Sequence, residues 1–237
     1  MELKEGLVIK TINYQDNAKI IYLITDEGKK SIIVKGATNM KSHTFSYAQE
    51  LTHLAFDTKD KYLSTGKIIN SFINIKNDFK KLESCLLILE ITYDLIDHIN
   101  NYNIFYYFLL EILNLMNNTN NHELLELIFR VKILYLLGVA PVFTECVDCK
   151  TKENLLGFSF YDGGMKCKDH LFAGDNVVDH NTINLLKYLY ISKLNKLSLS
   201  LDEVDFSYNE ANLFLNSYYD YYLGFKSRVE RVLSKFK

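Results

Sequence analysis

The chain has 237 residues, and 48% of them are hydrophobic, so it can bury a substantial core. This composition excludes general disorder. The formal net charge is −2, so the overall balance does not mark a nucleic-acid-binding protein; such a role would have to come from an uneven distribution of charge. The N-terminal residues lack the basic and apolar segments of a secretory signal, and the apolar runs are too interrupted to span a membrane. We therefore expect a cytoplasmic protein without a membrane partner.

The first part of the chain, up to about residue 78, has the short alternating segments typical of β structure. Asp26, Glu27 and Gly28 form a turn between the second and third segments, with glycine at the tight position. The expected strands cover residues 7–12, 19–25, 29–35, 50–57 and 64–73. Five short strands without a long helical pattern predict a small barrel.

From about residue 78 onward the hydrophobic period becomes helical, as Leu82, Leu86 and Leu89 illustrate. Further helical patterns cover residues 102–117, 122–137, 182–194 and 208–224. Gly138 is placed to end the third helix, and Ser207 with Glu210 is a candidate capping box for the last one. The sequence therefore predicts an α+β protein with a barrel domain (1–78) and a helical domain (79–237).

Three cysteines and a histidine in the second half follow the spacing C-x2-C-x17-C-x2-H: Cys146, Cys149, Cys167 and His170. Two pairs of such ligands, one hairpin apart, can close a tetrahedron around Zn2+. Residues 155–166 predict the two strands of that hairpin, so the zinc-bound insert covers about residues 143–172. Because all four ligands come from the protein, the expected zinc is structural and not catalytic. The alternative is two cysteine pairs that only pack.

Basic side chains gather in residues 28–49, which contain four lysines and no acidic residue: Lys29, Lys30, Lys35 and Lys41. Aromatic residues, Phe45 and Tyr47, lie in the same stretch. Barrels of the oligonucleotide-binding (OB) class use such a face, because lysines contact phosphates and aromatic rings stack with bases. The alternative is an ordinary solvated barrel face.

A second basic cluster ends the chain: Lys226, Arg228, Arg231, Lys235 and Lys237. It has an equally good alternative explanation, because cations at a helix C-terminus complement the helix dipole. Among the tyrosines near this end, Tyr218, Tyr219, Tyr221 and Tyr222 are expected to pack on a helix with their hydroxyls in water.

Several segments, in this order along the whole chain, resemble the bacterial recombination mediator family RecO. Those that match the barrel of the family are residues 6–10, 14–16, 23–29, 34–37 and 41–42. Residues 129–130 and 136–141 are similar to the helix before its metal site, residues 158–160 with 163–164 to its zinc hairpin, and residues 223–228 to its C-terminal end.

The resemblance implies an N-terminal OB barrel, a helical C-terminal domain and a role without enzymatic turnover. Family members are mediators of DNA repair and homologous recombination that bind single- and double-stranded DNA and anneal complementary strands in the nucleoid. They also join RecR and the acidic, apolar-ended tail of the single-strand-binding protein, so that RecA can be loaded. By position, Lys29, Lys35 and Lys41 would face DNA. Lys226, Arg228 and Arg130 would contact DNA or an acidic partner tail.

Two other classes of function are possible from the residues alone. A zinc deaminase or hydrolase needs a His-x-Glu element ahead of the cysteines, but the nearest candidate, His122–Glu123, has the wrong spacing. The sequence also has no glycine-rich phosphate loop and no nucleophile elbow. The remaining alternative is a zinc-stabilised protein-interaction adaptor that does not bind DNA directly.

Overall fold

The computed structural model describes residues 3–175, 179–194 and 207–233. The chain forms two compact units: unit 1 comprises residues 1–122 and 229–237, and unit 2 comprises residues 123–228. Unit 2 is therefore inserted, in sequence, between two parts of unit 1. Within the part of the chain that the structure describes, no helix has the length and apolar character needed to cross a bilayer.

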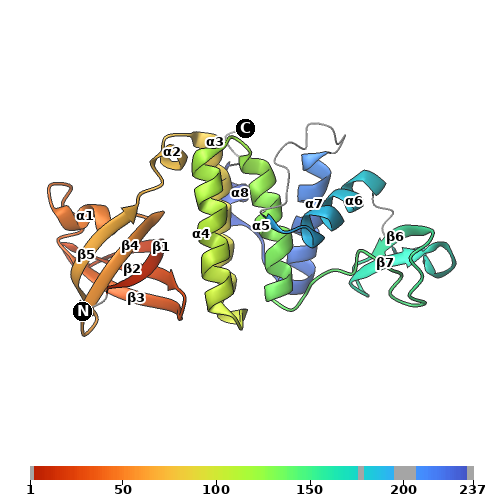
Figure 1. The fold of residues 1–237 in the computed structure, drawn as a ribbon, viewed down its shortest axis with the longest axis horizontal. Coiled ribbons are helices and arrows are strands. Elements are labelled where there is room, and N and C mark those ends of the chain that lie inside the picture. Colours follow the sequence, from red (N-terminus) through yellow and green to blue (C-terminus); the bar gives the residue numbers. More distant parts are fainter. Residues whose placement is uncertain (1–2, 176–178, 195–206, 234–237) are drawn as a thin grey trace. The chain divides into compact units, whose positions relative to one another are not determined.

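Unit 1 begins with a closed barrel whose strand order is β1-β2-β3-β5-β4 (Figure 1). The strands are β1 (Lys4–Tyr14), β2 (Ala18–Thr25), β3 (Gly28–Lys35), β4 (Thr52–Lys59) and β5 (Tyr62–Asn70). All neighbours pair antiparallel except β3 and β5, which meet in parallel at Ile33 and Tyr62. The predicted five-stranded barrel is confirmed.

The core of the barrel follows from the alternation of side chains along each strand. The inward-facing residues of β2, β3 and β4 are buried together: Ile21, Leu23, Ile32, Val34, Leu54 and Phe56. Between β3 and β4, the chain forms a short helix, α1 (His43–Tyr47), which begins at Ser42, whose hydroxyl accepts from the Thr44 backbone N–H. The sequence did not predict α1, because five residues are too short for a helical period to be visible.

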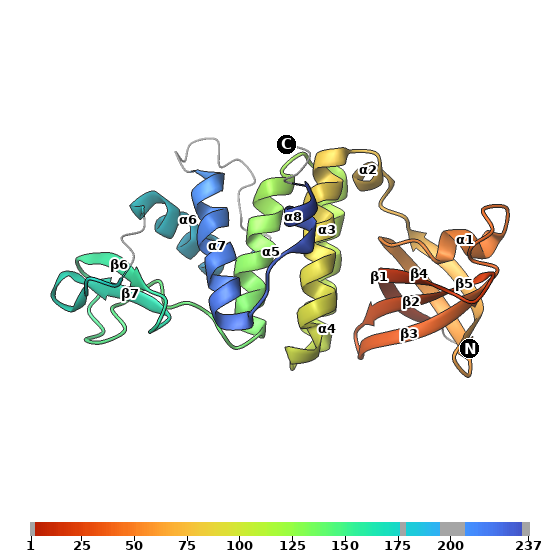
Figure 2. The same cartoon turned by 180° about the vertical axis from the view of Figure 1, so that it is seen from behind.

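Helices follow the barrel in unit 1 (Figure 2). They are α2 (Ile73–Lys76), α3 (Phe79–Leu95), the 3-10 helix η1 (Ile96–His98) and α4 (Tyr102–Asn118). The outer face of the barrel contacts them: β1 meets α3, β2 meets α4, and β3 meets η1. His53 of β4 and the Tyr106 hydroxyl of α4 form a hydrogen bond of 2.9 Å across this contact. The C-terminal helix α8 (Arg228–Leu233) returns to α3, where the Val229 N–H donates to Glu90.

Unit 2 contains the helices α5 (His122–Leu136, whose first residue belongs to unit 1), α6 (His180–Ile191) and α7 (Tyr208–Leu223). Gly138, with a φ of 73°, ends α5 as predicted. Ser207 caps α7 as predicted, but the Glu210 carboxylate accepts from the Thr182 hydroxyl and so links α7 to α6. Between α5 and α6 lies the hairpin of β6 (Leu155–Ser159) and β7 (Gly164–Cys167), followed by the 3-10 helix η2 (Lys168–His170).

Three of the C-terminal tyrosines donate their hydroxyls to backbone carbonyls. Tyr218 donates to the Val139 carbonyl at 2.9 Å, and Tyr219 to the Arg130 carbonyl at 2.8 Å. Tyr222 donates to a carbonyl of the hairpin region. The prediction of helix packing holds. That of hydrated hydroxyls is wrong for these three tyrosines, because the carbonyls beneath this face of α7 need donors, whereas Tyr221 is 55% exposed.

Candidate metal centre and nucleic-acid interface

The hairpin of unit 2 brings the four predicted metal ligands to one place. The first pair sits on a tight turn, in which the Lys150 N–H donates to the Cys146 carbonyl and Lys150 has a φ of 63°. Cys167 ends β7, and η2 turns the chain back so that His170 faces the cysteines. The turn and the hairpin therefore position two ligand pairs side by side.

The distances between the ligand atoms suit a metal ion with tetrahedral coordination. The sulfurs of Cys149 and Cys167 are 3.7 Å apart, and Nδ1 of His170 lies 3.2 Å from the Cys167 sulfur. All four ligand atoms lie within 4.8 Å of one another. A tetrahedron with Zn–S bonds of about 2.3 Å has edges of about 3.8 Å. The cluster can therefore hold a metal ion, as the spacing predicted.

The electrostatics around Cys146 favour the thiolate, which is the form that binds metal. Burial raises the pKa of this thiol, but backbone N–H groups, including those of Cys149 and Cys167, outweigh burial and lower the pKa to about 6. Behind the cluster, Lys166 is buried and pairs with Asp148 at 2.7 Å and Asp162 at 2.8 Å. Its charge is thus balanced inside the hairpin.

The two lysines at the start of β3 lie on opposite faces of this strand, and each forms an ion pair. Lys29 pairs with Asp97 of η1 and lies 5.2 Å from the centre of the Tyr93 ring, on the face that the helices cover. Lys30 points to the other face and pairs with Glu27, which also binds Lys4. The structure therefore does not bring Lys29 and Lys30 together on one open surface.

Lys35 and Lys41, by contrast, are both exposed. The Lys35 ammonium lies 4.4 Å from the centre of the Tyr62 ring, and the Lys61 ammonium lies 6.0 Å from the same ring. We call Lys35, Lys61 and Tyr62 the Tyr62 cluster. Sequence reasoning did not single out Lys61 or Tyr62, because only the parallel closure of β3 on β5 brings them beside Lys35.

The Tyr62 cluster lies at the end of an apolar row across the outer face of the barrel. The register pairs Ile12 with Ile20, Ile20 with Ile33, and Ile33 with Tyr62. Ile12 is 39% exposed, although it is apolar. This part of the outer face combines apolar side chains, an aromatic ring and cations, which is the combination that binds single-stranded nucleic acid in OB barrels.

The three predicted contact residues of unit 2 and α8 have different surroundings. Arg130 is only 2% exposed, and its guanidinium donates to Asn212, Asn216 and Glu126. Such burial leaves it no surface for DNA or a partner tail. Lys226 is exposed and pairs with Asp220 at 2.9 Å, and Arg228 is exposed at the start of α8. Lys235 and Lys237 lie outside the described residues.

A closed five-stranded barrel, followed by helices that carry a hairpin with a Cys3His cluster, defines an OB-type protein with a metal-binding helical region. Comparison with protein families gives two matches: "Recombination protein O N terminal" over residues 1–72 and "Recombination protein O C terminal" over residues 76–229. The chain belongs to the RecO family, and its role is therefore in DNA repair and recombination.

Curated relatives support the same family over nearly the whole length. Proteins called DNA repair protein RecO from Bacillus cereus (strain AH187), Bacillus anthracis and Bacillus cytotoxicus are each 28% identical to this chain over 243 residues. The matches cover 98% of this chain and 96% of each relative.

Proposed function

We propose that this protein binds single- and double-stranded DNA on the exposed outer face of the barrel and anneals complementary strands there. The observation that supports this surface is the Tyr62 cluster, where two lysines flank one aromatic ring. Lysines neutralise phosphates, and an aromatic ring stacks with a base of any identity. Lys41 is exposed in the loop that follows β3 and would add a further cation for phosphate.

Annealing on such a surface needs no catalytic group. Cations that contact two strands at once lower the repulsion between the strands, so that base pairing can begin. Contacts that do not depend on sequence let the strands slide until they pair in register. We therefore propose a mediator without enzymatic turnover. Its metal would be a structural Zn2+, because four protein ligands leave no open position for an activated water.

A pocket in unit 2 suits the acidic, apolar-ended tail of the single-strand-binding protein. It has a volume of about 380 Å³ and lies between the hairpin and α6. Its lining includes the apolar side chains of Phe143, Leu155 and Ile183 together with Lys152 and Lys187, and no acidic residue. An apolar terminal residue would fill the pocket while the lysines bind the carboxylates.

From family membership we also propose association with RecR and the indirect loading of RecA onto coated DNA. In this scheme, the pocket of unit 2 would bring the protein to DNA coated by the single-strand-binding protein, and the barrel would contact the strand. The competing proposal, an adaptor that contacts only proteins, would use the unit 2 pocket alone.

The test of DNA binding compares Lys35→Glu/Lys61→Glu with the wild type in strand annealing and in fluorescence anisotropy with a single-stranded oligonucleotide. We expect weaker binding and slower annealing. The plot of log affinity against log salt should also become less steep by about 0.7 for each lost phosphate contact. Lys80→Glu, at an exposed position of α3, is the control for a charge reversal outside the Tyr62 cluster. If both variants anneal at the wild-type rate, the Tyr62 cluster is not the DNA surface; if no form binds DNA, the adaptor is correct.

A further inference from the structure

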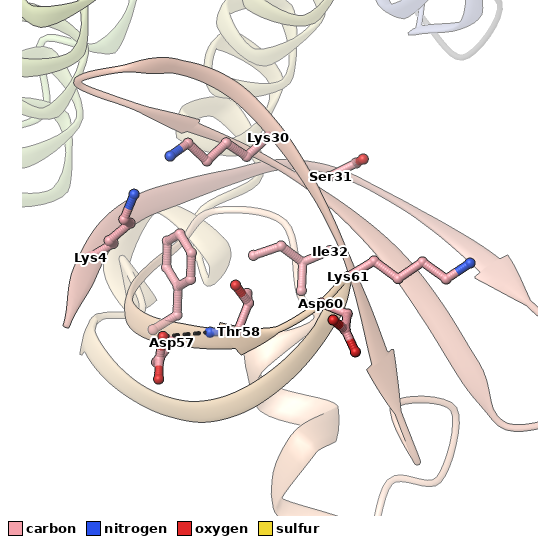
Figure 3. Close-up of a pocket in the computed structure, with 9 residues that line it drawn as sticks. Lys4, Lys30, Ser31, Ile32, Asp57, Thr58, Asp60 and Lys61 are labelled. Carbon is pink, nitrogen blue, oxygen red and sulfur yellow. Dashed lines mark hydrogen bonds between the residues drawn. The ribbon is translucent and has the colours of Figure 1, made fainter. Parts of the chain in front are cut away.

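The barrel has a pocket at the place where its wall is least complete. β3 and β5 pair only at Ile33 and Tyr62, and the Ile33 N–H donates to the Lys61 carbonyl at 2.8 Å. Before Ile33, residues 30–32 of β3 and residues 56–58 of β4 line an opening. The opening holds a pocket of about 330 Å³, shown in Figure 3, which we call the β3–β4 pocket.

Two lysines lie at the edge of this pocket on the inner face of the barrel. Lys30 precedes the core residue Ile32 by two positions, so both side chains lie on the same face of β3. Lys4 of β1 is the cross-strand partner of Phe56, which also belongs to the core. Figure 3 shows the ammonium groups of Lys4 and Lys30 on the same side of the opening. We call these two residues the lysine rim.

The two aspartates that border the pocket do not neutralise the lysine rim. Asp57 follows the inward-facing Phe56, so its side chain lies on the outer face of β4. Asp60 is exposed in the turn between β4 and β5. Both carboxylates point away from the ammonium groups of the rim (Figure 3), and neither forms an ion pair with a described residue.

The anion that does bind the lysine rim is Glu27, in the turn between β2 and β3. Its Oε2 atom lies 3.2 Å from the Lys4 ammonium and also forms an ion pair with Lys30. Two ammonium groups thus converge on one oxygen atom, as they would on a phosphate oxygen. The side chains of Glu27 and Lys4 are 58% and 59% exposed. Because exposed ion pairs contribute little stability, another anion can replace this carboxylate at a small cost.

Lys61 connects the pocket to the Tyr62 cluster. Its residue borders the pocket, while its ammonium extends away from the lysine rim (Figure 3) and lies near the Tyr62 ring. A strand that binds the Tyr62 cluster is therefore tethered beside the pocket, and the tether raises the effective concentration of its phosphates there. A free anion has no such tether. A bound strand can thus displace Glu27 under conditions in which free phosphate does not.

We propose that the lysine rim binds one backbone phosphate of a DNA strand, and that Glu27 occupies this site until a strand displaces it. This inference rests on the proposed function, because it assumes that the strand follows the Tyr62 cluster. The contact involves no base, so it is compatible with strands that slide during annealing. Glu27 keeps free phosphate out of the site and takes the place of the DNA phosphate when the strand moves on.

The experiment measures the affinity of the full-length protein for a single-stranded oligonucleotide by fluorescence anisotropy. Glu27→Gln should bind roughly fivefold more tightly, because the competing carboxylate is gone. Lys4→Met/Lys30→Met should bind less tightly, and its plot of log affinity against log salt should be less steep by about 0.7, the value for one phosphate contact. When all three substitutions are combined, the gain from Glu27→Gln should vanish, since no ammonium group remains for the carboxylate to block.

Asp26→Asn is the matched control, because it removes the same charge from the neighbouring exposed position of the turn. Asp26 forms no ion pair with a described residue, so this variant should keep the wild-type affinity. An equal gain from Asp26→Asn, a gain that persists without Lys4 and Lys30, or no gain from Glu27→Gln would overturn the phosphate site and leave DNA binding intact. Glu27→Gln that tightened binding of an acidic peptide but not of the oligonucleotide would overturn it as well.

A titration with inorganic phosphate, followed by NMR of the Lys30 amide, gives a readout that does not need an oligonucleotide. We expect shifts at lower phosphate concentration in Glu27→Gln than in the wild type, and none when Lys4 and Lys30 are also replaced. If no form of the protein binds the oligonucleotide, the proposed function fails. Phosphate shifts that require both lysines would then keep the rim as an anion site, and their absence would overturn it too.

Discussion

Arg130 is one of three arginines in the chain, and it is the one that the fold buries. Side-chain oxygens of Glu126, Asn212 and Asn216 accept from its guanidinium, and Tyr219 lies 5.6 Å beneath it. From the sequence alone, a basic residue in a helix is expected to lie on the surface and to be available to a partner. The two asparagines come from positions more than eighty residues away, so only the packing of α7 on α5 reveals the structural role of Arg130.

We predict that Arg130→Met lowers the free energy of unfolding of unit 2 by about 3 kcal/mol, since it removes a buried guanidinium that binds one half-buried carboxylate and two half-buried amides. Urea denaturation measures the loss. Lys226→Met, which removes a cation from an exposed ion pair, serves as the control and should change stability little. An equally small effect of Arg130→Met would show that the guanidinium network does not stabilise unit 2.

His53 makes the stability of unit 1 depend on pH. Burial lowers the pKa of His53 below its ordinary value of 6.5, and the nearby Glu5 carboxylate opposes that shift. Below about pH 6.5 the unfolded chain binds a proton that the folded chain excludes, so stability is full above this pH and falls as the pH drops through it. We predict that His53→Gln reduces this loss between pH 7 and pH 5, as measured by urea denaturation at each pH. An unchanged pH dependence would assign the loss to other groups.

At the scale of elements, the periodic segments could be predicted and the short ones could not. The five strands and the helices α3 to α7 were expected from their hydrophobic periods, and the cysteine spacing indicated the hairpin. Boundaries shifted by a few residues; α6 ends at Ile191, not at residue 194. At that end, the Lys132 ammonium donates to the carbonyls of Tyr190 and Ser192, a contact between helices that no local pattern contains.

A metal ion would join the two ligand pairs and so add stability to the hairpin, which already packs on α7 through Phe158 and Phe214. We predict that the purified protein contains one Zn2+ per chain, and that Cys167→Ser both loses it and lowers the thermal midpoint of unit 2. Elemental analysis and calorimetry measure the two effects. Cys85→Ser, at a buried cysteine outside the cluster, should keep the metal. Wild-type protein without metal, prepared under reducing conditions, would contradict the prediction.

The end of α7 depends on one glycine. Gly224 has a φ of 60°, and the N–H groups of Gly224 and Phe225 donate back to the last turn of α7. A Cβ at Gly224 would meet no atom within 4 Å, so the cost of substitution is purely conformational. We predict that Gly224→Ala destabilises unit 2 by about 1 kcal/mol, and that Gly224→Asn costs less because asparagine tolerates this conformation. Equal stabilities of the two variants in urea would contradict this reasoning.

At the scale of the whole molecule, the sequence predicted the fold class and the family, but not which lysines share a surface. Lys29 and Lys30 are adjacent in sequence, yet one pairs with Asp97 and the other with Glu27. Lys35 and Lys61 are 26 positions apart, yet they flank one ring. Alternation along β3 separates Lys29 from Lys30, whereas only the closure of β3 on β5 brings Lys35 beside Lys61.

We also predict that the two units bind different partners, so that substitutions in one unit weaken only one of the two interactions. Lys152→Glu/Lys187→Glu should weaken binding of a labelled peptide with the tail sequence of the single-strand-binding protein, because it reverses both charges of the unit 2 pocket. Its affinity for bare oligonucleotide should stay unchanged. Lys35→Glu/Lys61→Glu should show the opposite pattern. If each pair of substitutions weakened both interactions equally, the two proposed sites would not be independent.

Because α8 returns to α3, truncation of the chain at its C-terminal end affects unit 1. Since the last described segment docks on the barrel-containing unit, a protein shortened just before Val229 would lose the hydrogen bond from the Val229 N–H to the Glu90 carboxylate. Removing the tail would thus weaken the unit at the opposite end of the sequence. A fragment that stops at His122 lacks the same brace, whereas one that joins His122 to Val229 through a short artificial linker restores it.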